Sequence, residues 1–274
     1  MGGIALIMLV IVALATLIWW LFIHTEGVLL GRRVVIWLYD LYATRYDNIK
    51  GNDDEDEHEL IAIPLMKAIA PHTDPLVLDV AGGTGRIPIA LWQHDLFEGH
   101  VICIDRSTNM LQQGAEKLQD SQDVVTLMHM DAMSLQFADG SFDIVTCMEA
   151  LEFFPDMQRG IHEWSRVLRD GGILLTTMRQ NASFTPNIWD ATTFEAQLRE
   201  AGFEAIRFQI WQEDYQQVWA RKGGTSEFVG ARPPEEVTLC PQCQSLALQP
   251  QDNQWMCNSC KRVLPVYHGV VNFM

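Results

Sequence analysis

The amino-acid sequence predicts a doubly wound α/β fold with a mostly parallel sheet, and two observations lead to this prediction. From residue 60 onward, apolar strand-like segments alternate with helical patterns, as they do in successive βαβ units. A glycine-dense turn, AGGTG at 81–85, follows one such strand directly and precedes a helical pattern at 87–92. Glycines let the backbone turn sharply, and the N–H groups at the start of the helix face the same point. We therefore expect a ligand site at the carboxyl edge of the sheet.

The expected sheet has a parallel part and a closing antiparallel pair. The candidate parallel strands are residues 76–80, 101–104, 124–128, 142–148 and 172–178. A helical pattern at 194–201 comes next, and strand patterns at 203–211 and 215–221 are expected to close the sheet. Cys103 and Cys147 lie inside apolar strands, so we expect them to pack in the core.

Residues 4–23 form an apolar run of 20 residues without a charged side chain. A helix of about 20 such residues spans the hydrocarbon core of a bilayer. A cleavable signal peptide is the alternative, but only three residues precede the run and none of them is basic. Trp19 and Trp20 near its end, followed by Arg32 and Arg33, favour a single-pass anchor whose C-terminal side lies in the cytoplasm.

Residues 31–48 follow the apolar run and combine aromatic side chains with a helical pattern. The apolar positions at helical spacing are Val35, Leu38, Leu41 and Tyr42. We expect a helix that lies near the membrane and then covers the core domain. Between residues 53 and 59, six of seven side chains are acidic, which is typical of a solvated loop.

The net charge limits the classes of partner. The chain has 19 basic and 35 acidic residues, so its formal net charge is −16. Nucleic-acid binding depends on clustered lysine and arginine side chains that contact phosphates. Bulk binding of RNA or DNA is therefore disfavoured, although the charge alone does not exclude it.

The glycine turn can be compared with three kinds of nucleotide-type cofactor site. A dinucleotide-binding fingerprint in this register requires glycine or alanine where the chain has Pro88. A phosphate loop requires Gly-Lys-Ser/Thr, and the sequence contains no such triplet. The segment VLDVAGGTGR at 77–86 instead resembles motif I of the class I S-adenosylmethionine (SAM) dependent methyltransferases, Asp-x-Gly-x-Gly-x-Gly.

Motif I fits with one departure. Asp79, Gly83 and Gly85 match the pattern, and Ala81 replaces its first glycine. Alanine is tolerated at position 81 if the backbone keeps φ negative. The segments DGSFD at 139–143 and RVLRDGG at 166–172 resemble the family's turns before its fourth and fifth strands. The resemblance implies a Rossmann-like fold and SAM as the cofactor.

The resemblance also implies which residues bind SAM. Asp105 ends the second strand, 20 residues after Gly85, where a carboxylate accepts hydrogen bonds from both ribose hydroxyls. Asp131 and Ala132 follow the third strand, where relatives contact the adenine amino group, although Asp131 equally suits a helix cap. The residues expected to contact the cofactor are Asp79, Ala81, Gly82, Gly83, Gly85, Asp105, Arg106, Asp131, Ala132, Met148 and Tyr46.

Two segments bear on the methyl acceptor. The sequence YDLYATRYD at 39–47 looks like the N-terminal lid of quinone-biosynthesis methyltransferases, which borders the cofactor, although plain packing of its tyrosines is the alternative. Glu149 and Glu152 follow the fourth strand, where relatives place residues beside the transferable methyl group. Either glutamate is a candidate base, but acidic residues at a helix start also serve as caps.

The C-terminal cysteines form two C-x-x-C pairs, Cys240 with Cys243 and Cys257 with Cys260, separated by 13 residues. Two such pairs can bind one Zn²⁺ tetrahedrally, and four cysteine ligands leave no open position, so we expect a structural zinc ribbon. Disulfides are the alternative, but a reducing cytoplasm disfavours them. The tail LPVYHGVVNF at 264–273 resembles the end of zinc-ribbon modules attached to some RNA and translation-factor methyltransferases.

These expectations combine into a domain plan and a function. The planned segments are an anchor at 1–26, a lid and acidic loop at 27–60, a methyltransferase domain at 61–222, a linker at 223–234 and the ribbon at 235–274. The expected function is membrane-anchored methyl transfer to a small or lipophilic acceptor. The alternatives are an RNA or protein methyltransferase that uses the ribbon for its substrate, and a catalytically silent adaptor with a SAM fold.

Overall fold

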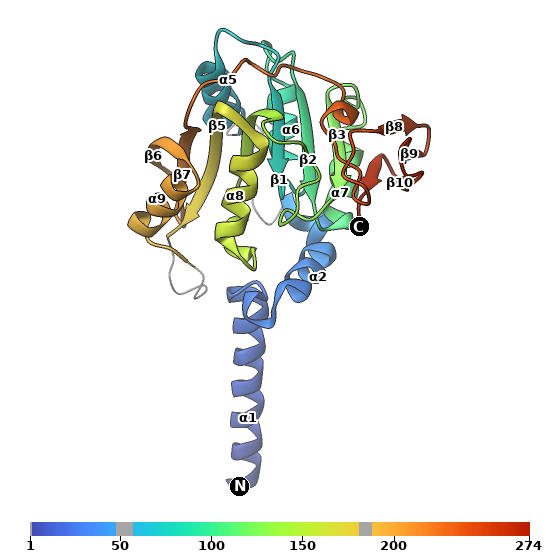
Figure 1. Ribbon diagram of the computed structural model, residues 1–274. Coiled ribbons are helices and arrows are strands. Elements are labelled where there is room, and N and C mark those ends of the chain that lie inside the picture. Colours follow the sequence, from blue (N-terminus) through green and yellow to red (C-terminus); the bar gives the residue numbers. More distant parts are fainter. Residues whose placement is uncertain (1, 48–56, 181–187) are drawn as a thin grey trace.

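The computed structural model describes residues 2–47, 57–180 and 188–274, and one sheet runs through it (Figure 1). Its first seven strands are β1 (Leu76–Val80), β2 (His100–Asp105), β3 (Val125–His129), β4 (Phe142–Cys147), β5 (Leu168–Arg179), β6 (Phe203–Gln212) and β7 (Tyr215–Lys222). Its last four strands are β8 (Leu248–Gln251), β9 (Gln254–Cys257), β10 (Val263–Tyr267) and β11 (Val270–Asn272). The strand order is β6-β7-β5-β4-β1-β2-β3-β11-β10-β9-β8.

The central strands confirm the predicted fold class. Strands β3, β2, β1, β4 and β5 pair in parallel, and β7 and β6 add an antiparallel hairpin at one edge. All five residues of β1 are buried, as expected for a parallel strand covered on both faces. Strand β5 begins at Leu168, four residues before the predicted start, because Leu168 pairs with Phe142 ahead of a register shift.

Helices cover both faces of the sheet and form two cores. On one face pack α5 (Ile63–Ile69), α6 (Arg86–Trp92) and α7 (Thr108–Lys117), which bury side chains such as Leu65, Leu91 and Leu111. On the other face pack α8 (Met157–Val167) and α9 (Ala191–Glu200), with Trp164 and Leu198 fully buried. This two-faced arrangement leaves the carboxyl ends of β1, β2 and β4 open to a ligand.

The N-terminal apolar run forms helix α1 (Gly2–Trp19), which continues as a π-helical turn over Trp20–His24. The most apolar 18-residue window within these 23 residues has a mean hydropathy of 2.8, and none of that window is buried by the rest of the chain. Helix α1 extends away from the sheet, with the N-terminus at its far end (Figure 1). By length and composition it could cross a membrane, and a signal sequence has the same properties.

A short 3₁₀ turn, Val28–Leu30, connects α1 to α2 (Arg32–Tyr42), and a second 3₁₀ turn, Ala43–Arg45, follows. Helix α2 lies between α1 and the carboxyl ends of the strands (Figure 1). Val35 and Leu38 are buried as the sequence predicts, but Leu41 is exposed. Helix α2 therefore covers the domain with part of its surface and leaves an apolar residue uncovered.

The cysteine-rich segment extends the main sheet. Strand β11 pairs in parallel with β3, so that Val270 lies beside Leu127 and Asn272 beside His129. Strands β10, β9 and β8 continue from β11 in antiparallel order. We expected a separate ribbon after the linker at 223–234, but its last strand is a strand of the main sheet. The other boundaries of the domain plan stay predictions.

Candidate functional site

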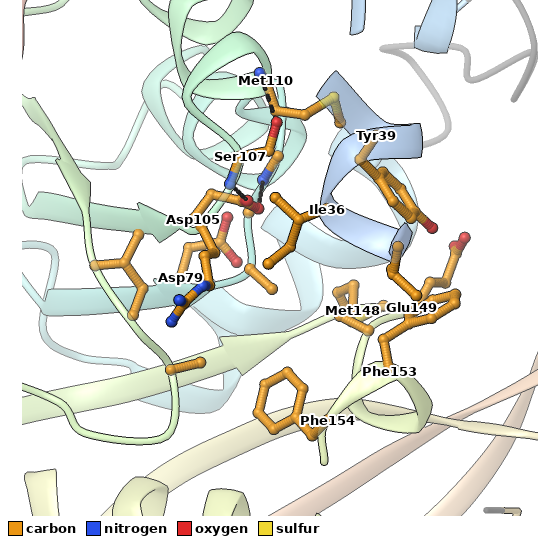
Figure 2. A pocket seen from close by; sticks show the side chains of 18 of the residues that line it. Ile36, Tyr39, Asp79, Asp105, Ser107, Met110, Met148, Glu149, Phe153 and Phe154 are labelled. Atoms are coloured by element: carbon orange, nitrogen blue, oxygen red, sulfur yellow. Dashed lines mark hydrogen bonds between the residues drawn. The ribbon is translucent and has the colours of Figure 1, made fainter. Parts of the chain in front are cut away.

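A cavity lies at the carboxyl ends of β1, β2 and β4, and helix α2 covers it (Figure 2). The predicted site residues that line it are Tyr46, Asp79, Ala81, Gly82, Gly83, Asp105, Arg106, Ala132, Met148 and Glu149. Three other predicted residues, Gly85, Asp131 and Glu152, are not part of its wall. Side chains that the sequence analysis missed, notably Arg32, Ile36 and Arg86, complete the cavity.

The glycine turn brings the backbone against the ends of β1 and β2. The N–H of Gly82 donates to the carbonyl of Ile104 at 3.1 Å. A Cβ atom at Gly82 would lie 2.2 Å from Asp79 Oδ2 and 2.5 Å from Cys103 Sγ, so only glycine fits. The condition for alanine at position 81 is not met, because the φ of Ala81 is +56°. Alanine there has the left-handed conformation that the family's glycine adopts without strain.

Asp79 presents a buried carboxyl group to the cavity. The hydroxyl of Thr146 donates to Oδ1 at 2.7 Å, whereas Oδ2 forms no hydrogen bond of standard geometry with the described residues. Burial raises the pKa of Asp79 to about 7, and the Thr146 hydroxyl and the Arg86 guanidinium only partly oppose this shift. A buried acceptor of this kind suits a positively charged donor from a ligand.

Asp105 links the second strand to the glycine turn. Its carboxylate accepts the N–H of Gly83 at 2.9 Å and the N–H of Ser107 at 2.7 Å. The Ser107 side chain in turn caps α7 by accepting the N–H of Met110 at 3.1 Å, and Figure 2 shows this chain of contacts. Burial raises the pKa of Asp105, although the N–H groups of Ser107 and Gly83 oppose the shift. The carboxylate keeps lone pairs that face the cavity.

Asp131 behaves differently from the expectation. Its carboxylate pairs with the guanidinium groups of Arg32 and Arg106, and Arg32 Nη1 donates to Oδ2 at 2.9 Å. Burial alone would raise the pKa of Asp131, but Arg32, the N–H of Met133 and Arg106 together lower it. Because α2 lies far from β3 in the sequence, no local pattern predicts this pairing. Ala132, the neighbouring residue, does line the cavity.

Helix α2 and the turn after it are fixed to the cofactor side of the cavity. Asp40 Oδ1 accepts the hydroxyl of Ser107 at 2.5 Å, and Asp47 Oδ1 accepts the hydroxyl of Thr84 at 2.7 Å. Both aspartates belong to the repeated Tyr-Asp pairs that suggested a lid. The aspartates anchor the lid, while Tyr39 and Tyr46 face the cavity.

Of the two candidate bases, Glu149 lies at the cavity and Glu152 does not. Glu149 follows β4 with a φ of +53°, and Trp211 Nε1 donates to its Oε1 at 3.2 Å. Arg86 lies 3.6 Å from the same oxygen. Glu152 is buried beside Arg179 and accepts the hydroxyl of Tyr215, and burial raises its pKa. Its contacts are those of a structural network.

Arg86 also corrects the expectation for the acidic segment. The guanidinium pairs with Glu57, which is only 4% exposed. Glu57 is therefore a buried partner of the cavity wall, whereas a solvated loop was expected. Residues 53–56 of the same acidic run lie outside the described residues.

The chain matches a known family over the core of the sheet. Residues 78–176 match the methyltransferase domain family. The chain carries a class I SAM-dependent methyltransferase domain. Demethylmenaquinone methyltransferases of Staphylococcus aureus are 37% identical to it over 133 residues, which are 48% of this chain and 55% of the relative. The chain thus spans just over half the length of these relatives.

Solved structures resemble this chain in fold. The [4+2]-cyclase SpnF has a TM-score of 0.58 at 20% identity, and the match covers 71% of this chain and 98% of SpnF. A putative SAM-dependent methyltransferase of Methanococcus maripaludis has a TM-score of 0.55 at 17% identity, covering 68% and 94% of the two chains. Because one neighbour is a cyclase, the fold alone does not determine the reaction.

The residues that line the cavity suit SAM. The buried Asp79 carboxyl group suits the ammonium group, and the close backbone at Gly82 leaves room for a ligand against the turn. The Asp105 carboxylate faces the cavity where ribose hydroxyls would donate. Apolar side chains, among them Ile104 and Met130, line the remainder and suit a purine ring.

The four C-terminal cysteines converge on one point. Their sulfur atoms all lie within 4.8 Å of one another, and the pairs Cys240–Cys260 and Cys243–Cys257 are each 3.6 Å apart. Disulfides need sulfur atoms about 2.05 Å apart, so these thiols are free. A tetrahedral site with Zn–S bonds of about 2.3 Å has sulfur atoms about 3.8 Å apart. The cluster has the geometry of the predicted structural zinc site.

Proposed function

We propose that the protein is a membrane-anchored SAM-dependent methyltransferase that methylates a small, lipophilic acceptor of the quinol type. One observation carries the proposal: a single cavity has the cofactor turn on one side and α2 on the other, and α2 directly follows the apolar helix. The S. aureus relatives are named for demethylmenaquinone, a lipophilic quinone, and this supports the acceptor class.

The cofactor side of the cavity holds SAM through the carboxyl groups of Asp79 and Asp105 and the glycine turn. Bound there, SAM would supply a sulfonium whose methyl group is the electrophile and whose thioether is the leaving group. The protein contributes mainly position, since aligning donor and acceptor removes much of the barrier. Arg106 and Ala132 close this side of the cavity.

The acceptor side is aromatic and contains one carboxylate. Figure 2 shows Ile36 and Tyr39 of α2 near Met148, Glu149 and Phe153. A flat aromatic acceptor can stack among these side chains. With SAM bound, the Glu149 carboxylate would take the proton that the acceptor loses as its new bond to the methyl carbon replaces the methyl–sulfur bond. The products would be the methylated quinol and S-adenosylhomocysteine.

Helix α1 is proposed to anchor the enzyme with its catalytic domain in the cytoplasm. Its length and hydropathy suit a bilayer, and Arg32 and Arg33 follow it as positively charged residues do on the cytoplasmic side. Alkaline carbonate extraction of membranes tests the anchor. Retention in the membrane pellet is expected, and release of the full-length protein into the supernatant would refute it.

The activity is tested with labelled SAM and full-length protein in lipid nanodiscs, offered reduced lipid extract, RNA and protein fractions separately. We expect label in the lipid fraction. We also expect Glu149→Gln to lower the rate by about 100-fold without changing SAM affinity, since a general base contributes at least that much. Glu152→Gln is the matched control, and its rate of methyl transfer should fall far less.

Two outcomes would contradict the proposal and favour another function. Label in RNA or protein alone would favour a macromolecular substrate that the ribbon helps to bind. SAM binding without label in any fraction would favour the silent adaptor.

A further inference from the structure

A second cavity lies where the end of the apolar helix segment meets α2. Its lining residues are Phe22, Ile23, Glu26, Leu38, Tyr39, Tyr42 and Tyr46. Its volume is about 300 Å³. We call it the junction cavity.

The junction cavity shares two walls with the cofactor cavity. Tyr39 and Tyr46 line both cavities, and their ring centroids lie 5.9 Å apart. Tyr39 also contacts Phe153 edge-on, with centroids 5.7 Å apart. The two cavities therefore adjoin each other at Tyr39 and Tyr46.

The junction cavity suits a hydrocarbon. Among its described lining residues Glu26 alone is charged, and that charge has partners. The hydroxyl of Tyr39 donates to Glu26 Oε2 at 2.9 Å, and Arg179 Nη1 lies 3.6 Å from Glu26 Oε1. Tyr39 and Arg179 thus pair with the Glu26 carboxylate, and the other lining side chains are aliphatic or aromatic.

The outer face of α2 indicates that this junction lies at the membrane surface. Arg33, Trp37, Leu41 and Arg45 follow one another at intervals of four residues, and all four are exposed. Trp37 is 55% exposed and Leu41 58% exposed. A stripe with an aromatic and an aliphatic residue between two arginines is typical of a surface that rests on lipid headgroups. The junction cavity is thus within reach of a lipid in the bilayer.

We propose that the junction cavity binds the hydrocarbon tail of a membrane-resident acceptor, while the acceptor's ring occupies the cofactor cavity beyond Tyr39 and Tyr46. This inference rests on the proposed function, because it supplies the tail of the same lipophilic acceptor. It assigns a binding site to residues that touch neither the cofactor turn nor Glu149. Phe22, Ile23, Leu38 and Tyr42 are its specific members.

The proposal predicts how affinity depends on tail length. Each methylene group moved from water into an apolar site strengthens binding by about fourfold, from about 0.8 kcal/mol per group. A quinone with one prenyl unit should therefore bind more than tenfold more tightly than the tail-free ring. The gain should level off once the tail fills the cavity.

Photo-crosslinking tests the site without requiring turnover. The probe is a 1,4-naphthoquinone whose prenyl tail ends in a diazirine, added to full-length protein in phosphatidylethanolamine–phosphatidylglycerol nanodiscs. Peptide mapping should find the label on Phe22, Ile23, Leu38 or Tyr42. Label confined to Trp37 and Leu41, on the outer face of the same helix, would overturn the proposal because the tail would then lie in the bilayer.

A filling variant gives the second readout. Leu38→Trp should reduce crosslinking and lower kcat/KM for the reduced prenylated quinone by about tenfold, while SAM affinity stays within twofold. Leu41→Trp, the same change on the outer face, is the control and should have little effect. If Leu38→Trp does not fold, Ile23→Trp replaces it, since Ile23 is half-exposed and tolerates a larger side chain.

The outcomes separate the two proposals. Methyl transfer to neither the prenylated nor the tail-free quinol would refute the proposed function, and the crosslinking map would still decide the tail site. Equal kcat/KM for both quinols, with Leu38→Trp affecting neither, would refute the tail site while leaving the methyltransferase activity intact.

Discussion

Asp79 has the most unusual environment of the cofactor residues, since its carboxyl group is buried and its pKa is raised to about 7 by burial. If the carboxylate pairs with the SAM ammonium group, binding requires the ionised form. Between pH 7 and pH 6 the ionised fraction falls from about one half to about one eleventh, so we expect about fivefold weaker SAM binding. Calorimetry at the two pH values checks this.

Asp79→Asn is the matched variant for this prediction. It should bind SAM more weakly at pH 7 and lose most of the pH dependence. Equal pH dependence in both proteins would assign the titration to another group, such as the neighbouring Asp105.

The same raised pKa determines how the stability of the cofactor-free protein depends on pH. In the folded protein the pKa of Asp79 lies above the ordinary value of 3.8. The contribution of Asp79 to the free energy of unfolding is therefore fully present below pH 3.8 and is lost as the pH rises through about 7. The melting temperature of Asp79→Asn relative to the wild type should therefore increase from pH 5 to pH 8. A constant difference would show that Asp79 ionises normally.

Substitutions at the adjacent residues Gly82 and Ala81 are expected to have opposite effects on the free energy of unfolding. The Cβ of Gly82→Ala would collide with Asp79 and Cys103, so we expect a loss of about 1–3 kcal/mol in unfolding free energy and at least tenfold weaker SAM binding. Ala81→Gly removes an alanine at φ +56°, which relieves about 1 kcal/mol of strain and is partly offset by unfolded-state entropy. Denaturant unfolding should therefore give Ala81→Gly a stability no lower than wild type. A stable, SAM-binding Gly82→Ala would contradict this account.

At the scale of elements, much of the sheet could be predicted because apolar periodicity is local. The strands from β1 to β7 fall within a few residues of their predicted positions, and only β5 starts markedly earlier. The partner of β11 could not be predicted, since nothing in Val270–Asn272 specifies pairing with β3. The same reason explains why Arg32 was missed as the partner of Asp131.

The β11–β3 pairing connects the ribbon to the cofactor site. His129 of β3 lies between Asn272 Oδ1 at 3.1 Å and the carbonyl of Arg106 at 3.0 Å. Arg106 lines the cavity directly after Asp105. A folded ribbon therefore helps to hold in place the backbone at Arg106, next to Asp105.

This connection predicts the effect of removing the metal. Cysteine ligation of zinc stabilises small ribbons strongly, so a chelator should unfold the ribbon and release β11. We expect one zinc per chain by metal analysis, and after chelation a lower melting temperature and weaker SAM binding, both restored by added Zn²⁺. Cys257→Ser should mimic chelation, whereas Leu246→Ala on the exposed ribbon surface should not. A metal-free protein with full SAM affinity would contradict the connection.

At the scale of the whole molecule, the apolar helix, the lid and the cofactor turn follow one another in space as they do in the sequence. Helix α1 leads into α2, and α2 covers the cavity at the carboxyl ends of the strands (Figure 1). The net charge of −16 disfavours bulk binding of polyanions, while Arg33 and Arg45 provide local positive charge beside the apolar helix. This arrangement suits an enzyme that takes its acceptor from a membrane.

We propose that the cavity under α2 binds SAM through Asp105 and the glycine turn. Isothermal calorimetry of SAM with full-length protein in nanodiscs tests this binding, with Asp105→Ala as the variant and Asp139→Ala, in an exposed turn, as the control. We expect one SAM per chain, at least tenfold weaker binding for Asp105→Ala, and unchanged binding for Asp139→Ala. Absence of SAM binding, or equal affinity in all three proteins, would refute the proposed cofactor site.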